Sequence, residues 1–160
     1  EAAQEGLFRG CTYCLVPSPS AGPEAMSMMV DMVKGIGARP LVLEAGVHDE
    51  LVAGISHLPL VASCALVSAT TKSRLWPRMA PLAASGYRDT TRLASGSPEM
   101  GRDICLTNQG AILPWLDRFV AELVQFRLWM ERQEGEALGA AFAGAREARE
   151  TWLAWKKATA

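Results

Sequence analysis

The chain has 160 residues, of which 49% are hydrophobic and 21% are charged, and its formal net charge is −1. This length and composition are typical of a globular protein with its own core, and they exclude an intrinsically disordered chain. The near-zero charge and the lack of any run rich in Lys or Arg give no electrostatic attraction to nucleic acid or an anionic membrane.

The first 45 residues alternate between strand and helix signals. A short strand is expected at residues 12–16, then a helix that begins at Pro23 and ends near Gly35, and a second short strand at residues 41–43. Such a β-α-β unit normally belongs to a parallel sheet, and two strands alone do not make a stable one. Residues 1–45 are therefore expected to form the C-terminal edge of a larger Rossmann-like domain.

Cys11 and Cys14 form a C-x-x-C pair, which can mark a zinc site or a redox pair. Here the pair lies on the first expected strand, where positions three apart point to opposite faces. The chain also has only two histidines to complete a zinc site. Buried, reduced cysteines are the favoured interpretation, and no metal site is expected.

The rest of the chain is expected to be helical. Apolar residues recur at helical spacing in residues 51–66, 112–126 and 138–155. Pro59 lies inside the first stretch and predicts a kink there. A loop is expected at residues 77–86, and Ser97 followed by Pro98 should begin another helix. The fold class is mainly α, with a helical domain at residues 46–160.

Membrane insertion and export are not expected. The longest apolar stretch, residues 58–69, is interrupted by Pro59 and two serines, and it is shorter than the roughly 20 residues that cross a bilayer. The first residues have neither the basic nor the apolar region of a signal peptide. Both features favour a cytoplasmic protein.

Two clusters hold the residues most able to do chemistry. In the first, Asp49 and Ser56 are seven residues apart, so a straight helix would place them on one face, with His57 about 100° to one side. A kink at Pro59 would project Ser56 and His57 into a cleft. Each residue alone is more often a cap or a surface group, so a structural role stays open. His48 lies beside Asp49 in the same cluster.

The second cluster follows Gly86 and includes Arg88, Asp89 and Arg92. It could be a solvated surface loop. A glycine-containing loop that carries Arg, Asp and Thr also suits anion recognition, because a guanidinium binds a carboxylate through two parallel hydrogen bonds.

The order and spacing of these segments resemble the prephenate/arogenate dehydrogenase family along essentially the whole chain. The matching segments are Leu7-Phe8-Arg9-Gly10, Tyr13, Pro17, His48-Asp49, Ser56-His57-Leu58-Pro59, Gly86-Tyr87-Arg88-Asp89-Thr90-Thr91-Arg92-Leu93-Ala94, Pro98-Glu99-Met100, Asp103-Ile104 and Asn108.

The resemblance implies a set of substrate-binding residues. Arg92 would bind a substrate carboxylate and Asp89 would orient Arg92. Ser56 and His57 would line the pocket, and Gly86 would let the loop approach closely. The chain departs from many family members at two positions, with Leu60 in place of a second His and Gly101 in place of Trp. Both departures leave the choice between prephenate and arogenate open. Asp49, if it faces the pocket, would favour the amine of arogenate.

The resemblance also implies an NAD- or NADP-dependent oxidative decarboxylation in tyrosine biosynthesis, and a homodimer formed by the helical domain. The family's catalytic His and Ser and its G-x-G-x-x-G turn lie before the point that matches Glu1. No catalytic or cofactor-binding residue is therefore expected in this chain, which alone should be inactive and bind no dinucleotide tightly. The alternative is a non-enzymatic helical oligomerisation or regulatory module derived from the family.

Overall fold

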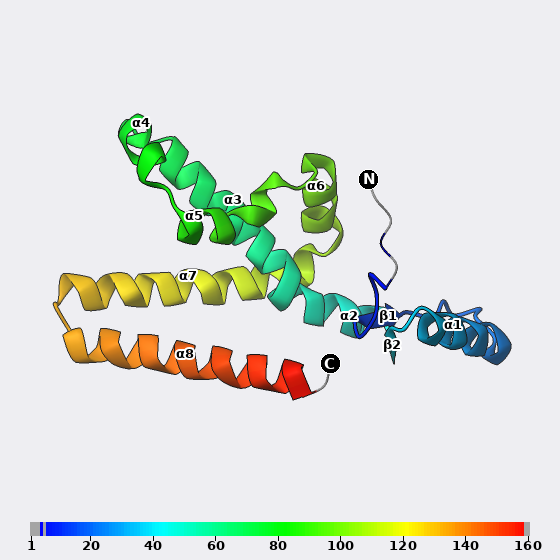
Figure 1. The fold of residues 1–160 in the computed structure, drawn as a ribbon. Coiled ribbons are helices and arrows are strands. Elements are labelled where there is room, and N and C mark those ends of the chain that lie inside the picture. Colours follow the sequence, from blue (N-terminus) through cyan, green and yellow to red (C-terminus); the bar gives the residue numbers. More distant parts are fainter. Residues whose placement is uncertain (1–3, 5, 159–160) are drawn as a thin grey trace. The chain divides into compact units, whose positions relative to one another are not determined.

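A computed structural model describes Gln4 and residues 6–158. Within this part the chain is mainly helical, with one short β-α-β unit near its start, which confirms the expected fold class (Figure 1). Contacts divide the chain into two compact units. One comprises Glu1–His48 with Val120–Ala160, and the other comprises Asp49–Phe119. The expected division into domains at residues 1–45 and 46–160 stays a prediction.

The β-α-β unit consists of strand β1 (Thr12–Leu15), helix α1 (Pro23–Gly35) and strand β2 (Arg39–Val42). The two strands pair in parallel, as expected, with Thr12 opposite Arg39. Val33 of α1 is fully buried against Leu15 and Ala38. Strand β2 begins before residue 41 because the Arg39 backbone N–H donates to the Cys11 carbonyl at 2.8 Å, which the apolar pattern does not register.

Cys11, just before β1, and Cys14, within it, are free thiols, but the expectation that they are buried is wrong. Cys11 and Cys14 are both exposed. Helix α1 covers the side of the two-stranded sheet that carries Leu15, and this leaves Cys14 on the open side.

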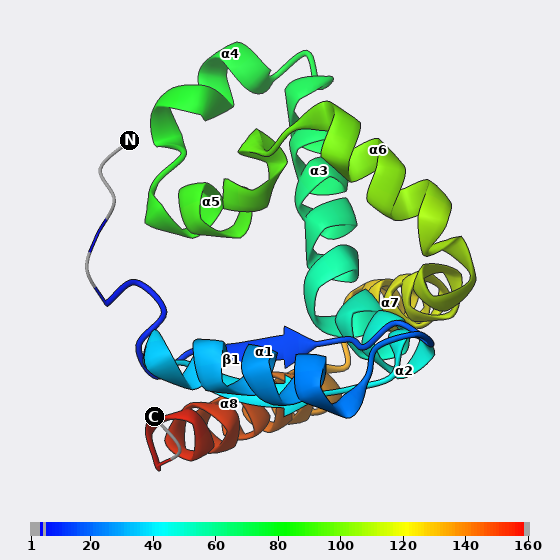
Figure 2. The same ribbon diagram turned by 90° about the vertical axis from the view of Figure 1, so that its right-hand side faces the viewer.

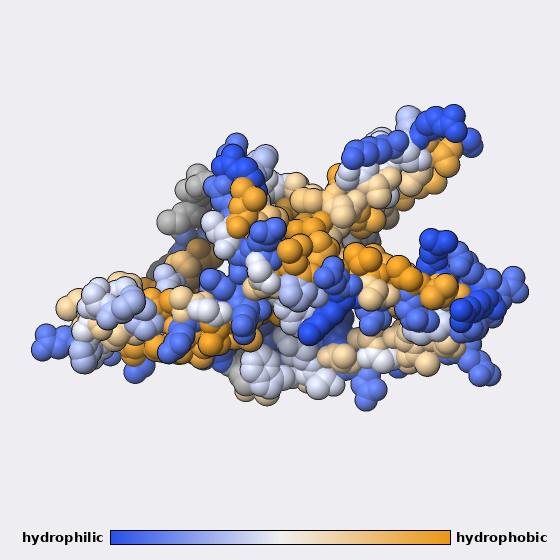
Figure 3. All heavy atoms as spheres, turned by 180° about the vertical axis from the view of Figure 1, so that it is seen from behind, coloured by the Kyte–Doolittle hydropathy of each residue, from blue (hydrophilic) through white to orange (hydrophobic). Residues whose placement is uncertain are grey.

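Two long helices, α7 (Gln109–Glu131) and α8 (Gly135–Ala158), run antiparallel and form a hairpin (Figure 1). The ring of Phe126 contacts those of Trp129 and Phe142, with centroids 5.4 and 5.5 Å apart. Much of the remaining apolar surface of the hairpin is open, and apolar side chains are visible on it in Figure 3. The exposed large residues are Val120, Leu123, Val124, Met130, Phe142, Trp152 and Trp155.

The unit Asp49–Phe119 is built around a continuous helical run, α2 (Ala45–Val52), η1 (Ala53–His57) and α3 (Leu58–Thr71). Shorter helices lie on both sides of α3 (Figure 2). They are α4 (Trp76–Met79), η2 (Ala80–Leu82), α5 (Ser85–Thr90), η3 (Arg92–Ser95) and α6 (Pro98–Thr107).

The loop expected at residues 77–86 is therefore wrong, since this segment is largely helical. It contains Gly and Pro, but tertiary contacts override these local signals. The Tyr87 hydroxyl lies 2.8 Å from Thr70 Oγ1 on α3, and its ring packs 5.8 Å from that of Trp76. By contrast, α6 begins as predicted, because the Ser97 hydroxyl accepts a hydrogen bond from the Met100 N–H.

A turn of π-helix lies just before Pro59, where a kink was expected. In η1 the Leu58 backbone N–H donates to the Ala53 carbonyl, five residues back. Pro59 then stands in the first turn of α3, where a missing N–H costs little. The expected local irregularity is therefore a π-turn that ends immediately before Leu58 and Pro59.

The continuous run Ala45–Thr71 has 27 residues and is long and apolar enough to cross a membrane. This run is longer than the apolar stretch at residues 58–69, from which no membrane insertion was expected. The run also makes polar contacts within its unit: buried Ser63 binds the backbone of Ala94, and His57 binds Asn108. We therefore interpret it as the central helix of the Asp49–Phe119 unit.

Candidate functional site

Three of the predicted site residues, Ser56, His57 and Arg92, line one hollow of about 510 Å³ in the Asp49–Phe119 unit. Residues from η1, α3, η3 and α6 form its walls. The other lining residues are Ile55, Leu60, Leu93, Ser95, Gly96, Met100 and Ile104. Residues that lie 36 positions apart in the sequence, such as Ser56 and Arg92, thus face the same space.

The π-helical turn η1 presents Ser56 and His57 to this hollow. A π-turn adds one residue to a helical turn, so it shifts the direction of the following side chains relative to a regular helix. Such turns recur at functional sites in proteins. Ser56 is exposed and His57 is half-buried, so both are accessible to a ligand.

The 3-10 helix η3 that carries Arg92 is fixed to α3 by one buried side chain. Ser63 is only 2% exposed, and its hydroxyl accepts a hydrogen bond from the Ala94 backbone N–H at 3.1 Å. One residue before Arg92, the Thr91 hydroxyl donates to the Tyr87 carbonyl at 2.7 Å. The turn that presents Arg92 is therefore held at both ends.

Arg92 itself has no carboxylate within ion-pair distance among the residues that the structure describes. Its neighbour Arg88 is different, because its Nε donates to Asp89 Oδ1 at 3.0 Å, with both side chains largely exposed. The hollow therefore contains a guanidinium whose charge is not balanced locally, beside a hydroxyl and an imidazole. Such a set is suited to binding an anion.

The structure places Asp89 and Gly86 outside the lining of the hollow. Asp89 binds Arg88 of α5 rather than Arg92 of η3. Gly86 is part of α5 and not of a loop, and a β-carbon there would meet nothing within 4 Å. No close approach therefore requires a glycine at this position within the chain.

Asp49 is also absent from the lining of the hollow. Its backbone carbonyl accepts a hydrogen bond from the side chain of Asn108 at 2.9 Å, and the same Asn108 nitrogen lies 3.1 Å from His57 Nδ1. Asn108 was among the residues that resemble the family, but no role was expected for it. Its spacing of 51 residues from His57 could not have indicated this contact.

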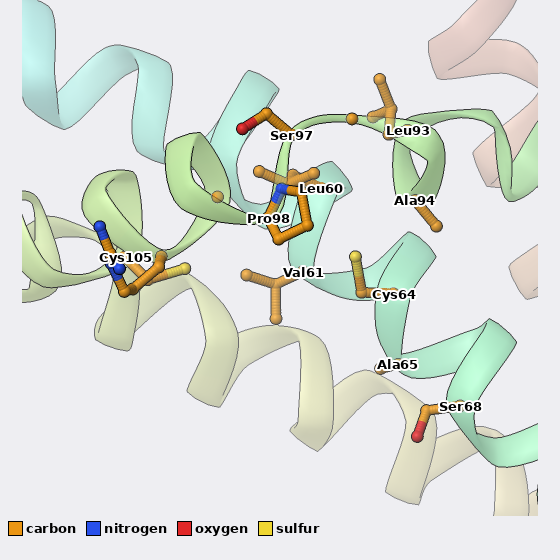
Figure 4. Close-up of a pocket in the computed structure, with 13 residues that line it drawn as sticks. Leu60, Val61, Cys64, Ala65, Ser68, Leu93, Ala94, Ser97, Pro98 and Cys105 are labelled. Carbon is orange, nitrogen blue, oxygen red and sulfur yellow. The ribbon is translucent and has the colours of Figure 1, made fainter.

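A second, apolar hollow of about 570 Å³ adjoins the first and shares Leu60, Leu93 and Gly96 with it. In Figure 4, side chains of α3 such as Val61 and Cys64 line it together with Pro98 at the start of α6. It carries little polar surface, so it suits apolar groups rather than charged ones.

A dinucleotide does not fit the residues of this chain. Its phosphates need a G-x-G-x-x-G turn that follows a strand and begins a helix. The only G-x-G in the sequence, Gly35-Ile36-Gly37, lacks the third glycine and follows a helix instead. In the described part of the chain, no group of three or more His, Cys, Asp or Glu could hold a metal ion.

Comparison with known proteins identifies the family. Residues 44–144 match the family model described as "Prephenate dehydrogenase, dimerization domain". The chain belongs to this family. The resemblance found in the sequence is thereby confirmed, and the match covers the whole Asp49–Phe119 unit and most of the helical hairpin.

Similar proteins are dehydrogenases that are longer than this chain. The chain is 35% identical to a prephenate dehydrogenase of Bacillus subtilis over 93% of its length, and 34% identical to a cyclohexadienyl dehydrogenase of Zymomonas mobilis over 89%. It spans 40% and 50% of these relatives, in their C-terminal portions. The crystal structure of Synechocystis arogenate dehydrogenase aligns with a TM-score of 0.80 and 29% identity, over 94% of this chain and 55% of that one.

Proposed function

We propose that this chain forms the substrate-binding wall and the dimer interface of an NAD- or NADP-dependent prephenate or arogenate dehydrogenase. One observation carries the proposal: Ser56, His57 and Arg92 line the same hollow, and Arg92 has no carboxylate partner among the described residues. Family membership adds support, because the similar proteins are prephenate, cyclohexadienyl and arogenate dehydrogenases.

The proposed substrate suits the hollow chemically. Prephenate and arogenate are cyclohexadienols with carboxylates, so a guanidinium provides both charge and two parallel hydrogen bonds. Ser56 and His57 would bind further oxygens, and Leu60 would contact the apolar ring. The oxidation itself needs a nicotinamide cofactor, and no step of it is assigned to this chain. A solved prephenate dehydrogenase of Aquifex aeolicus contains hydroxyphenyl propionate and NAD+.

We also infer a cytoplasmic homodimer. The matched family model is a dimerization domain of a soluble metabolic enzyme family, and the α7–α8 hairpin exposes several large apolar side chains. An exposed apolar surface of this kind is typical of an interface.

A hybrid enzyme tests the proposed function. The chain is joined to the part of the Synechocystis arogenate dehydrogenase that it does not span, and turnover of prephenate and of arogenate is measured with NAD and with NADP. We expect turnover of at least one substrate. A folded hybrid that binds the dinucleotide but oxidises neither substrate would overturn the proposal.

The unmodified chain provides the matching negative control. In calorimetry it should bind neither dinucleotide with micromolar affinity, because it has no phosphate-binding turn. Tight dinucleotide binding by the chain alone would contradict the proposal that the dinucleotide binds outside this chain.

A further inference from the structure

One polar side chain links the candidate site to the junction of α6 and α7. Asn108 Nδ2 lies 2.9 Å from the backbone carbonyl oxygen of Asp49 and 3.1 Å from Nδ1 of His57. Asp49 belongs to α2 and His57 ends the π-turn η1, so a single amide group contacts two successive elements of the central helix.

The carbonyl of Asp49 determines how this amide is oriented. A carbonyl oxygen only accepts hydrogen bonds, so the NH2 group of Asn108, and not its oxygen, must face it. An amide NH2 has two hydrogens. One is used by Asp49, and the other is left for His57 Nδ1, which must therefore accept.

The backbone of Asn108 holds this side chain in place. Its N–H donates to the Ile104 carbonyl at 3.0 Å, and its carbonyl accepts from the Ile112 N–H at 3.1 Å. Asn108 is thus bound to the last turn of α6 and the first turn of α7. Ile112 is buried, so the start of α7 is itself anchored.

We propose that Asn108 is a positioning residue that fixes the tautomer of His57 through its bond to Nδ1. A neutral imidazole carries one proton, and an Nδ1 that accepts leaves this proton on Nε2. His57 then presents an N–H donor, rather than an acceptor, to an oxygen of a ligand in the hollow. In the function proposed above, on which this last step rests, that oxygen belongs to the substrate.

In a purely structural role, Asn108 would connect the end of α6 to α2 but would not determine which nitrogen of His57 carries the proton. The two roles differ in one observable. Replacement of Asn108 by Asp puts acceptor oxygens next to Nδ1, so the proton should move from Nε2 to Nδ1. A merely structural tie predicts no such change of tautomer.

The test is ¹⁵N NMR of the full chain with labelled histidine, in the absence of any ligand and at a pH where the imidazole is neutral. The chain has two histidines, and the signals that disappear in His57→Gln identify those of His57. We expect the unmodified chain to carry its proton on Nε2, and Asn108→Asp to carry it on Nδ1. A matched control, Asn108→Ala, should give a mixture of both forms.

A proton on Nδ1 in the unmodified chain would overturn the proposal. This measurement uses only the unmodified chain, so it does not depend on whether any variant folds. An unchanged Nε2–H form in a folded Asn108→Asp chain would overturn it as well. These outcomes involve no substrate, so they are independent of the proposed function. In the hybrid enzyme, Asn108→Asp should raise KM about tenfold with a smaller change in kcat, because a hydrogen-bond donor to the substrate oxygen is lost from binding.

Discussion

The indole ring of Trp115, in the first part of α7, lies directly against the α-carbon of Gly54 in the π-turn η1. A β-carbon at Gly54 would come within 2.8 Å of Cε2 and 3.1 Å of Cδ2 of that ring. The guanidinium of Arg118 also lies over this ring, with its Cζ 4.9 Å from the ring centroid. Gly54, which precedes Ser56 by two positions and His57 by three, must therefore be small.

Gly54→Ala should lower the free energy of unfolding of the chain by about 1–3 kcal/mol, because the rigid indole must move to admit a methyl group. Urea unfolding followed by circular dichroism measures this change. Gly46→Ala is the matched control, since a β-carbon there meets nothing within 4 Å, and it should leave stability unchanged or raise it by up to about 1 kcal/mol.

The steric clash between a β-carbon at residue 54 and the ring of Trp115 can also be removed by a change at Trp115. In a Trp115→Ala background, Gly54→Ala should cost much less than in the unmodified chain, because the atoms that it meets are gone. Equal costs in both backgrounds would show that Gly54 is small for another reason, such as the conformation of the π-turn.

Ser63→Ala tests how η3 is held. The Ala94 N–H shares its hydrogen bond between Ser63 Oγ and the Thr91 carbonyl, so loss of the hydroxyl should cost about 1 kcal/mol. It should also loosen the turn that presents Arg92 and weaken substrate binding in the hybrid enzyme. Ser68→Ala, on the same helix but not bonded to η3, is the control. Unchanged KM in Ser63→Ala would contradict this role.

Much of the fold could be predicted from the sequence because it depends on local signals. The Pro23 start of α1, the Ser97 cap of α6 and the apolar period of α7 each act within a few residues, and all three are present in the structure. The prediction of a loop from Pro77 to Gly86 was wrong because the helices there depend on contacts of Tyr87 with α3. No local sequence pattern encodes these contacts.

The candidate site was predictable in part for the same reason. Ser56 and His57 are neighbours, so any helical turn brings them together, and Arg92 was found through the family pattern. The partners of these residues were not predictable. Asp89 is hydrogen-bonded to Arg88 rather than to Arg92. The contact between His57 and Asn108 depends on where α6 ends.

Glu99 should titrate at a low pH for a glutamate. Its own backbone N–H and the Ser97 hydroxyl, which donates at 2.8 Å, both lower the pKa of Glu99 below the usual 4.5. A lowered folded-state pKa stabilises the folded chain above the unfolded value, and this contribution is lost as pH falls through the folded value. In an NMR titration, Ser97→Ala should raise the pKa of Glu99. An unchanged pKa would contradict the contact.

The exposed apolar face of the hairpin should form the dimer interface. Leu123→Glu places a charge on a side chain that is 54% exposed, so it should leave the fold of the hairpin intact but disrupt an interface. Light scattering during gel filtration, at tens of micromolar, should give a dimer for the unmodified chain and a monomer for the variant. Glu122→Lys, at the adjacent exposed polar position, should remain dimeric. A monomeric unmodified chain would refute the proposed interface.

Arg92 and Arg88 allow the sharpest test of the substrate site, because they lie four residues apart and differ in their partners. Both side chains are exposed, but Arg92 lines the hollow and has no carboxylate partner in the described part of the chain, whereas Arg88 lies outside the hollow and is paired with Asp89. A substrate carboxylate that loses its guanidinium is left unpaired, which typically costs several kcal/mol.

In the hybrid enzyme, Arg92→Ala should therefore raise KM roughly one hundredfold, at about 1.4 kcal/mol for each factor of ten. Arg88→Ala should change KM by no more than a few-fold, because it removes only an exposed ion pair. Dinucleotide affinity should be the same in both variants, since the cofactor binds outside this chain in the proposed arrangement. If Arg88→Ala abolishes binding while Arg92→Ala does not, the substrate carboxylate is bound at α5 rather than at η3.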